Sequence, residues 1–114
     1  MNISMPRGDI RHIKFSITTV SGDNPPNFNE IYFTVKKGFN NADALFQKKL
    51  SNGGIIKGDD GCYHFTIVPE DTNDLKYGDY VFDIELCYQD QIKQTTVGTL
   101  RITNEVTFAG NEGD

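Results

Sequence analysis

Apolar and polar residues alternate with a period of two along this chain, and clusters of Gly, Pro, Asn and Asp interrupt the alternation. For example, Ile31, Phe33 and Val35 alternate with Tyr32 and Thr34. This pattern is typical of β-strands that bury one face and expose the other. Applied along the chain, it predicts strands at residues 11–20, 30–37, 44–50, 55–57, 62–68, 79–88 and 95–103.

The predicted strands follow one another at near-regular spacing, and no long helical pattern separates them. This order indicates an all-β fold, an antiparallel β-sandwich of about seven strands. A length of 114 residues supports one domain. We expect an N-terminal arm at 1–10, the sandwich at 11–108 and a disordered tail at 109–114. A short helix is the alternative for residues 44–50, which are good helix formers.

The polar corner before the strongest predicted strand has the residues of a tyrosine corner. Leu75 is followed by Gly78 and Tyr80, where that strand begins. In immunoglobulin-like sandwiches such a tyrosine packs under the corner, and its hydroxyl binds backbone a few residues upstream. Gly78 allows a left-handed backbone. The pattern favours an immunoglobulin-like sandwich, and we also expect one helical turn here, capped by Asp71 or Thr72.

Charge is distributed unevenly along the chain. The net charge is −5, with +4 over residues 1–58 and −9 over residues 59–114. An acidic chain disfavours general binding to nucleic acids or anionic membranes. The sequence also has neither an apolar run long enough to cross a membrane nor a signal-peptide pattern at its start. We therefore expect no nucleic-acid or membrane partner and no secretion.

Two sets of surface residues are candidates for contacts between copies, one basic and one acidic. Complementary patches of this kind let copies stack head to tail into rings or filaments. The alternative interpretation is two ordinary solvated faces. The basic set with its exposed aromatic is Tyr32, Lys36, Lys37, Lys48 and Lys49, and the acidic set on the other side is Asp71, Asp74, Asp79, Asp83 and Glu85.

Residues that could catalyse a reaction are few. Cys62 and His64 lie two apart on one predicted strand face, but no residue is predicted to orient the imidazole. His12 has the pattern of a surface histidine. Cys62 and Cys87 are both expected to point outward as reduced thiols without a disulfide. We therefore expect no enzymatic activity and no cofactor.

Calcium binding remains an alternative for the acidic stretch. Asp71, Asp74 and Asp79 surround the corner and could converge on a weak calcium site, although a solvated acidic face is the favoured interpretation. A calcium-aided carbohydrate-binding or adhesion module is therefore the second functional hypothesis. Such a module needs exposed aromatics, and Tyr32 is the clearest outward one in a chain without Trp.

Several segments together carry a family resemblance. The most specific is the run from Pro69 to Thr72 followed by Leu75, Gly78, Tyr80 and Asp83. The chain resembles the small immunoglobulin-like proteins of tailed phages and prophages, and is similar to the N-terminal domain of the baseplate upper protein of phages that infect Gram-positive bacteria. The remaining segments are residues 8–9, 15–17, 31–37, 46–48, 53–55, 65–68, 98–102 and 105–107.

This resemblance implies a non-enzymatic virion structural protein associated with a tail or baseplate. Its partners would be other phage tail proteins or copies of itself, and it would be made in the bacterial host cytoplasm. In the baseplate protein the sandwich is joined to a helical, receptor-facing part. Because this chain ends after the sandwich, we expect a decoration, connector or assembly role instead of receptor binding.

Overall fold

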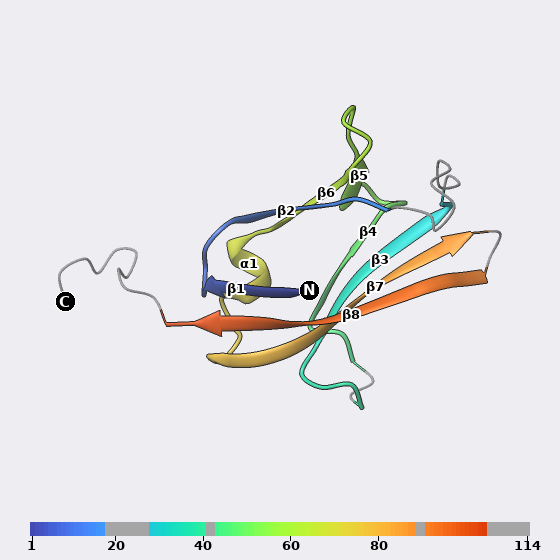
Figure 1. Cartoon of the computed structure of the whole chain (residues 1–114). Helices are drawn as coiled ribbons and strands as arrows, with labels where there is room; N and C mark the ends of the chain where they lie inside the picture. Colours follow the sequence, from blue (N-terminus) through green and yellow to red (C-terminus); the bar gives the residue numbers. More distant parts are fainter. Residues whose placement is uncertain (18–27, 41–42, 89–90, 105–114) are drawn as a thin grey trace.

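Two β-sheets pack against each other in the computed structural model, which describes residues 1–17, 28–40, 43–88 and 91–104 (Figure 1). The strands are β1 Asn2–Pro6, β2 Arg11–Phe15, β3 Glu30–Lys36, β4 Phe46–Lys49, β5 Ile55–Lys57, β6 Tyr63–Ile67, β7 Gly78–Tyr88 and β8 Gln91–Thr103. The larger sheet has the order β1-β8-β7-β3-β4, and the smaller sheet has the order β2-β6-β5. The predicted all-β sandwich is confirmed.

The chain crosses between the sheets after β1, β2, β4 and β6, whereas β3–β4, β5–β6 and β7–β8 are neighbouring pairs within one sheet. Among the described strands, β1 runs parallel to β8 and the other pairings are antiparallel. Strand β1 was not predicted and lies within the segment interpreted as an N-terminal arm. The end of the predicted strand at 11–20 and the tail at 109–114 lie outside the described residues.

Aromatic side chains from both sheets meet in the core. Phe33 on β3 and Phe82 on β7 are almost completely buried, and their ring centroids are 5.2 Å apart. Phe65 on β6 approaches Phe33 from the smaller sheet, at 4.4 Å between centroids. Burying one such side chain stabilises the fold by about 1.5–3 kcal/mol. The inward face predicted for β3 from the alternation is therefore the face that joins the sheets.

Gly98 on β8 allows β1 to pack closely on the larger sheet. A Cβ atom at this position would overlap the carbonyl oxygen of Met1 and lie 2.5 Å from the Phe82 ring. Both neighbours are held in place, one by backbone pairing and the other by the core. A side chain at this position would therefore force the strand and the ring apart.

The predicted helical turn is α1, Pro69–Thr72, which connects the smaller sheet to β7. Its N-cap is Val68, so the prediction of Asp71 or Thr72 as the cap is wrong. Asp71 instead reaches back from the third helical position, and its Oδ2 accepts a hydrogen bond from the Val68 N–H at 2.9 Å. The Thr72 side chain is fully buried, and its hydroxyl accepts the Gly8 N–H at 2.9 Å.

The tyrosine corner forms where α1 leads into β7. The buried Tyr80 donates its hydroxyl proton to the Lys76 carbonyl oxygen at 2.6 Å. Gly78 adopts a φ of 137°, a positive value that side chains disfavour. Leu75 packs against the core as a partly buried residue. The three residues thus make the contacts that the pattern requires.

The turn after β1 is fastened to the same corner. Arg7 donates from Nη2 to the Tyr77 hydroxyl at 2.9 Å, and its guanidinium lies 4.4 Å from that ring's centroid. Its Nη1 also lies 3.4 Å from the Leu75 carbonyl oxygen. Together with the Gly8–Thr72 hydrogen bond, these contacts hold the end of β1 in one position.

Candidate functional site

Both histidines and two lysines line an open groove of about 320 Å³ across the smaller sheet. The alternation of β2 and β6 positions them, because polar side chains of these strands point away from the core. Lys48 and the turn at Gly53 and Gly54 form the side nearest the larger sheet. The lining side chains are His12, Ile13, Lys14, Lys48, Ile56, His64, Phe65 and Thr66.

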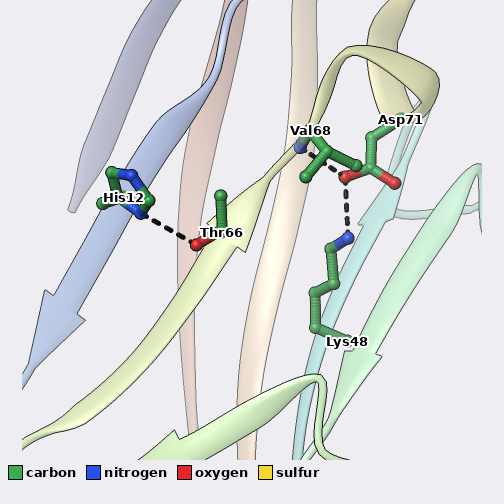
Figure 2. Close-up of polar contacts among 5 residues, drawn as sticks. All are labelled: His12, Lys48, Thr66, Val68 and Asp71. Carbon is green, nitrogen blue, oxygen red and sulfur yellow. Dashed lines mark hydrogen bonds and ion pairs between the residues drawn. The ribbon is translucent and has the colours of Figure 1, made fainter.

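Both histidines of the chain lie in this groove with defined partners. His12 Nδ1 is 2.9 Å from Thr66 Oγ1, its neighbour across the β2–β6 pair (Figure 2). His64 Nε2 is 3.1 Å from Asp60 Oδ1. Asp60 also accepts the Cys62 N–H, and these two hydrogen bonds hold the pKa of its carboxyl below the usual range. The groove therefore contains an oriented imidazole, which the sequence analysis did not predict.

Cys62 does not complete a catalytic pair with His64. The acid that orients the imidazole is present, but Cys62 is not among the groove-lining residues, and its backbone, not its thiol, contacts Asp60. Both cysteines are free thiols, as expected. In the described part of the chain we find no nucleophile hydrogen-bonded to either histidine ring apart from the Thr66 hydroxyl.

Cys87 lies on the outward face that was predicted for it, but it is nearly buried there. It shares the outer face of β7 with Glu85, yet it is only 9% exposed. Burial raises the pKa of the Cys87 thiol, and the charges of Glu85 and Glu30 raise it further. Strand parity predicts which face a residue occupies, but it does not show how well neighbouring strands cover that face.

Lys48 and Asp71 form an ion pair within the chain. Lys48 Nζ lies 2.7 Å from Asp71 Oδ2, and the two side chains are only 16% and 14% exposed (Figure 2). The same oxygen accepts the Val68 N–H, so this carboxylate joins β4 to α1. The sequence analysis placed these two residues on opposite contact surfaces, but they neutralise each other instead.

The other predicted contact residues are also interleaved. Tyr32 pairs directly with Glu85 across β3 and β7, and Asp83 lies on the same face two positions along. Burial raises the pKa of Asp83, and the nearby charge of Lys36 offsets part of that shift. One outer face of the larger sheet therefore carries members of the basic set and members of the acidic set. The two sets do not form separate sides of the molecule.

At the corner, Asp79 is engaged with a basic residue of its own sheet. Arg101 donates from Nε and Nη2 to the two carboxylate oxygens at 2.7 and 3.2 Å. These hydrogen bonds lower the pKa of Asp79. Asp74 and Lys37 remain exposed. Asp71, Asp74 and Asp79, which the sequence analysis considered as an alternative calcium site, do not form one, since the described residues include no group of three or more His, Cys, Asp or Glu suited to a metal ion.

Asp83 is the least satisfied polar residue of the described chain. Its Oδ1 is buried and has no hydrogen-bond partner among those residues. Burial raises the pKa of this carboxyl, and Lys36 opposes the shift. A small cavity of about 40 Å³ beside it is lined by Thr34, Lys36 and Phe39 among others, which is room for about one water molecule.

Tyr32 does not present an open aromatic platform. The Lys49 ammonium lies 5.8 Å from its ring centroid, and the ring is partly buried on the outer sheet face. Tyr63 on β6 is only 5% exposed. The geometry needed to stack a sugar ring is therefore not formed around Tyr32.

Comparison with known proteins adds no family to this description. No protein-family model matches the chain, and no curated protein is significantly similar to it. Within the described residues, no helix is long and apolar enough to cross a membrane.

Proposed function

We propose that this protein is a non-enzymatic structural protein of a phage or prophage virion, associated with the tail or baseplate. It acts through contacts with copies of itself or with a larger tail protein. The observation that supports an assembly role is the open form of both sheets, which end in the edge strands β1, β4, β2 and β5. Edge strands present unpaired backbone groups, which are templates for pairing with another chain. The virion assignment rests on the sequence resemblance.

The groove on the smaller sheet supports a non-catalytic role. His64 is held by Asp60 and His12 by Thr66, so each imidazole has a structural partner. Catalysis by an acid–base pair needs a reacting group within hydrogen-bond reach of the base. Cys62, the only nucleophile that the sequence analysis paired with a histidine, does not line the groove.

The contacts proposed here differ from simple stacking of opposite charges. Lys48 with Asp71, and Arg101 with Asp79, are already paired inside one chain. Backbone pairing at a strand edge depends little on ionic strength, whereas contacts between exposed charges weaken as salt increases. The salt dependence of assembly therefore separates the two kinds of contact.

Molar mass in solution tests the proposal, measured by size-exclusion chromatography with light scattering at low and at high salt. An oligomer at both salt concentrations supports assembly through strand edges, and an oligomer only at low salt supports charged contacts. Lys37→Glu changes an exposed member of the basic set, and Lys14→Glu is the matched control on the other sheet. A monomer under every condition would refute self-assembly.

A further inference from the structure

Strand β1 differs chemically from the other edge strands of the two sheets. Its sequence, Asn-Ile-Ser-Met-Pro, contains no charged side chain. The other edges each carry at least one cation: Arg11 and Lys14 on β2, Lys48 and Lys49 on β4, and Lys57 on β5. Charged residues on an edge are a common protection against pairing with identical strands. Strand β1 lacks this charge protection, and its remaining protections are its short length and Pro6 at its end.

The outward edge of β1 offers a regular set of backbone groups. The Met1 carbonyl oxygen accepts the Thr99 N–H, and the Arg7 N–H donates to the Thr103 carbonyl oxygen. Odd-numbered residues of β1 therefore bond to β8, and the backbone groups of Asn2, Ser4 and Pro6 point away from the sheet. These groups are two N–H donors and three carbonyl acceptors, because proline has no N–H.

The strand is already in a conformation that can accept a partner. Ile3 and Met5 are 7% and 1% exposed and anchor β1 on the core, whereas the side chains of Asn2 and Ser4 are exposed. The Arg7 contacts with the tyrosine corner fix its far end. A partner strand would therefore bind without the cost of ordering β1 first.

We propose that β1 pairs edge to edge with β1 of a second copy of this chain, in antiparallel orientation about a two-fold axis. This inference rests on the proposed assembly function, and it assigns the contact between copies to strand β1. Ser4 is the middle residue of β1, so full overlap places Ser4 opposite Ser4 of the second copy. The two serines then exchange two hydrogen bonds, and each Asn2 N–H donates to the Pro6 carbonyl oxygen across the axis. The two larger sheets become one continuous sheet.

A second copy fits this edge because none of the five residues of β1 is charged, so the overlap of the two strands brings no like-charged side chains together. Just beyond the strand the N-terminal ammonium of Met1 faces Arg7 of the other copy, whose guanidinium is held on the Tyr77 ring. The side chains that meet on the outer face are neutral, and the nearest charged residue in the Ser4 row, Arg101, is paired with Asp79. Self-pairing through β2, β4 or β5 would place cations near one another, which is destabilising. Among the described edges, β1 is therefore the one whose own side chains place no like charges across the axis.

The test uses opposite charges at the two-fold axis. Ser4→Lys and Ser4→Asp each place like charges opposite one another in the dimer, so each variant alone should lose dimerisation. An equimolar mixture of the two should dimerise again, because lysine then faces aspartate across the axis. Molar mass is measured by light scattering from about 10 μM to about 1 mM, since an edge contact of this size is weak.

Two controls separate this contact from other effects. Asn40→Lys and Asn40→Asp introduce the same charges at an exposed position of the β3–β4 connection and should leave dimerisation unchanged. Thermal melting checks that each Ser4 variant is folded. Restored dimerisation in the Ser4 mixture supports the proposal. A wild-type oligomer that both Ser4 variants retain would overturn the β1 contact alone, and a wild-type monomer at about 1 mM would overturn both this contact and self-assembly.

Discussion

The Lys48–Asp71 ion pair should contribute measurably to stability. We consider Lys48→Met, which removes the charge and keeps an unbranched side chain of similar length. Each side chain is less than one-fifth exposed, and the charged atoms are 2.7 Å apart. The variant leaves the Asp71 carboxylate largely desolvated, with the Val68 N–H as its one remaining hydrogen-bond partner among the described residues.

The expected cost lies between two known limits. Exposed pairs contribute about 0–1 kcal/mol, and removing one member of a fully buried pair costs about 3–5 kcal/mol. A pair of this intermediate burial should therefore cost about 1–3 kcal/mol when Lys48 becomes methionine. For a domain of this size, that corresponds to a decrease in melting temperature of about 3–12 °C.

Urea denaturation of four proteins measures the interaction itself. The set is the wild type, Lys48→Met, Asp71→Asn and the double variant, and the coupling free energy should be about 1–2 kcal/mol. Lys49→Met is the matched control on the same strand, because the Lys49 ammonium faces the Tyr32 ring and not a carboxylate. A coupling free energy below about 0.3 kcal/mol would show that the pair is effectively solvated and that the argument from burial is wrong.

Three further substitutions test other parts of the fold. Gly98→Ala should destabilise the protein by about 1–3 kcal/mol in urea denaturation, because the new methyl group meets the Phe82 ring; an unchanged midpoint would contradict the close packing of β1. Asp83→Asn should raise the melting temperature at pH 7 but not at pH 3. Because folding raises the pKa of the Asp83 carboxyl, the wild-type protein loses stability as pH rises through that pKa. Equal effects at both pH values would argue against a raised pKa. Tyr80→Phe should cost about 1 kcal/mol by removing the hydrogen bond to Lys76, and a neutral result would mean that water replaces the hydroxyl.

Local patterns in the sequence were sufficient for the type of fold and for several of its details. The alternation around Phe33 predicted both the strand and its buried face, because strand periodicity depends only on neighbouring residues. The tyrosine corner was predictable for the same reason, since Gly78 and Tyr80 act within a few residues of Lys76. Strand β1 was missed because a five-residue segment ending in proline carries too weak a local pattern.

Charge partners were not predictable in this way. The sequence assigned Lys48 and Asp71 to opposite surfaces, and only the packing of β4 beside α1 brings them to 2.7 Å. Likewise, it is the β5–β6 hairpin that places Asp60 against His64. The amino-acid sequence by itself determined the described strands other than β1, their inward faces and the tyrosine corner, because those depend on backbone periodicity and short-range contacts. The tertiary structure decided which charges are neutralised and which strand edge is left without charge, because these depend on how distant segments are arranged in space.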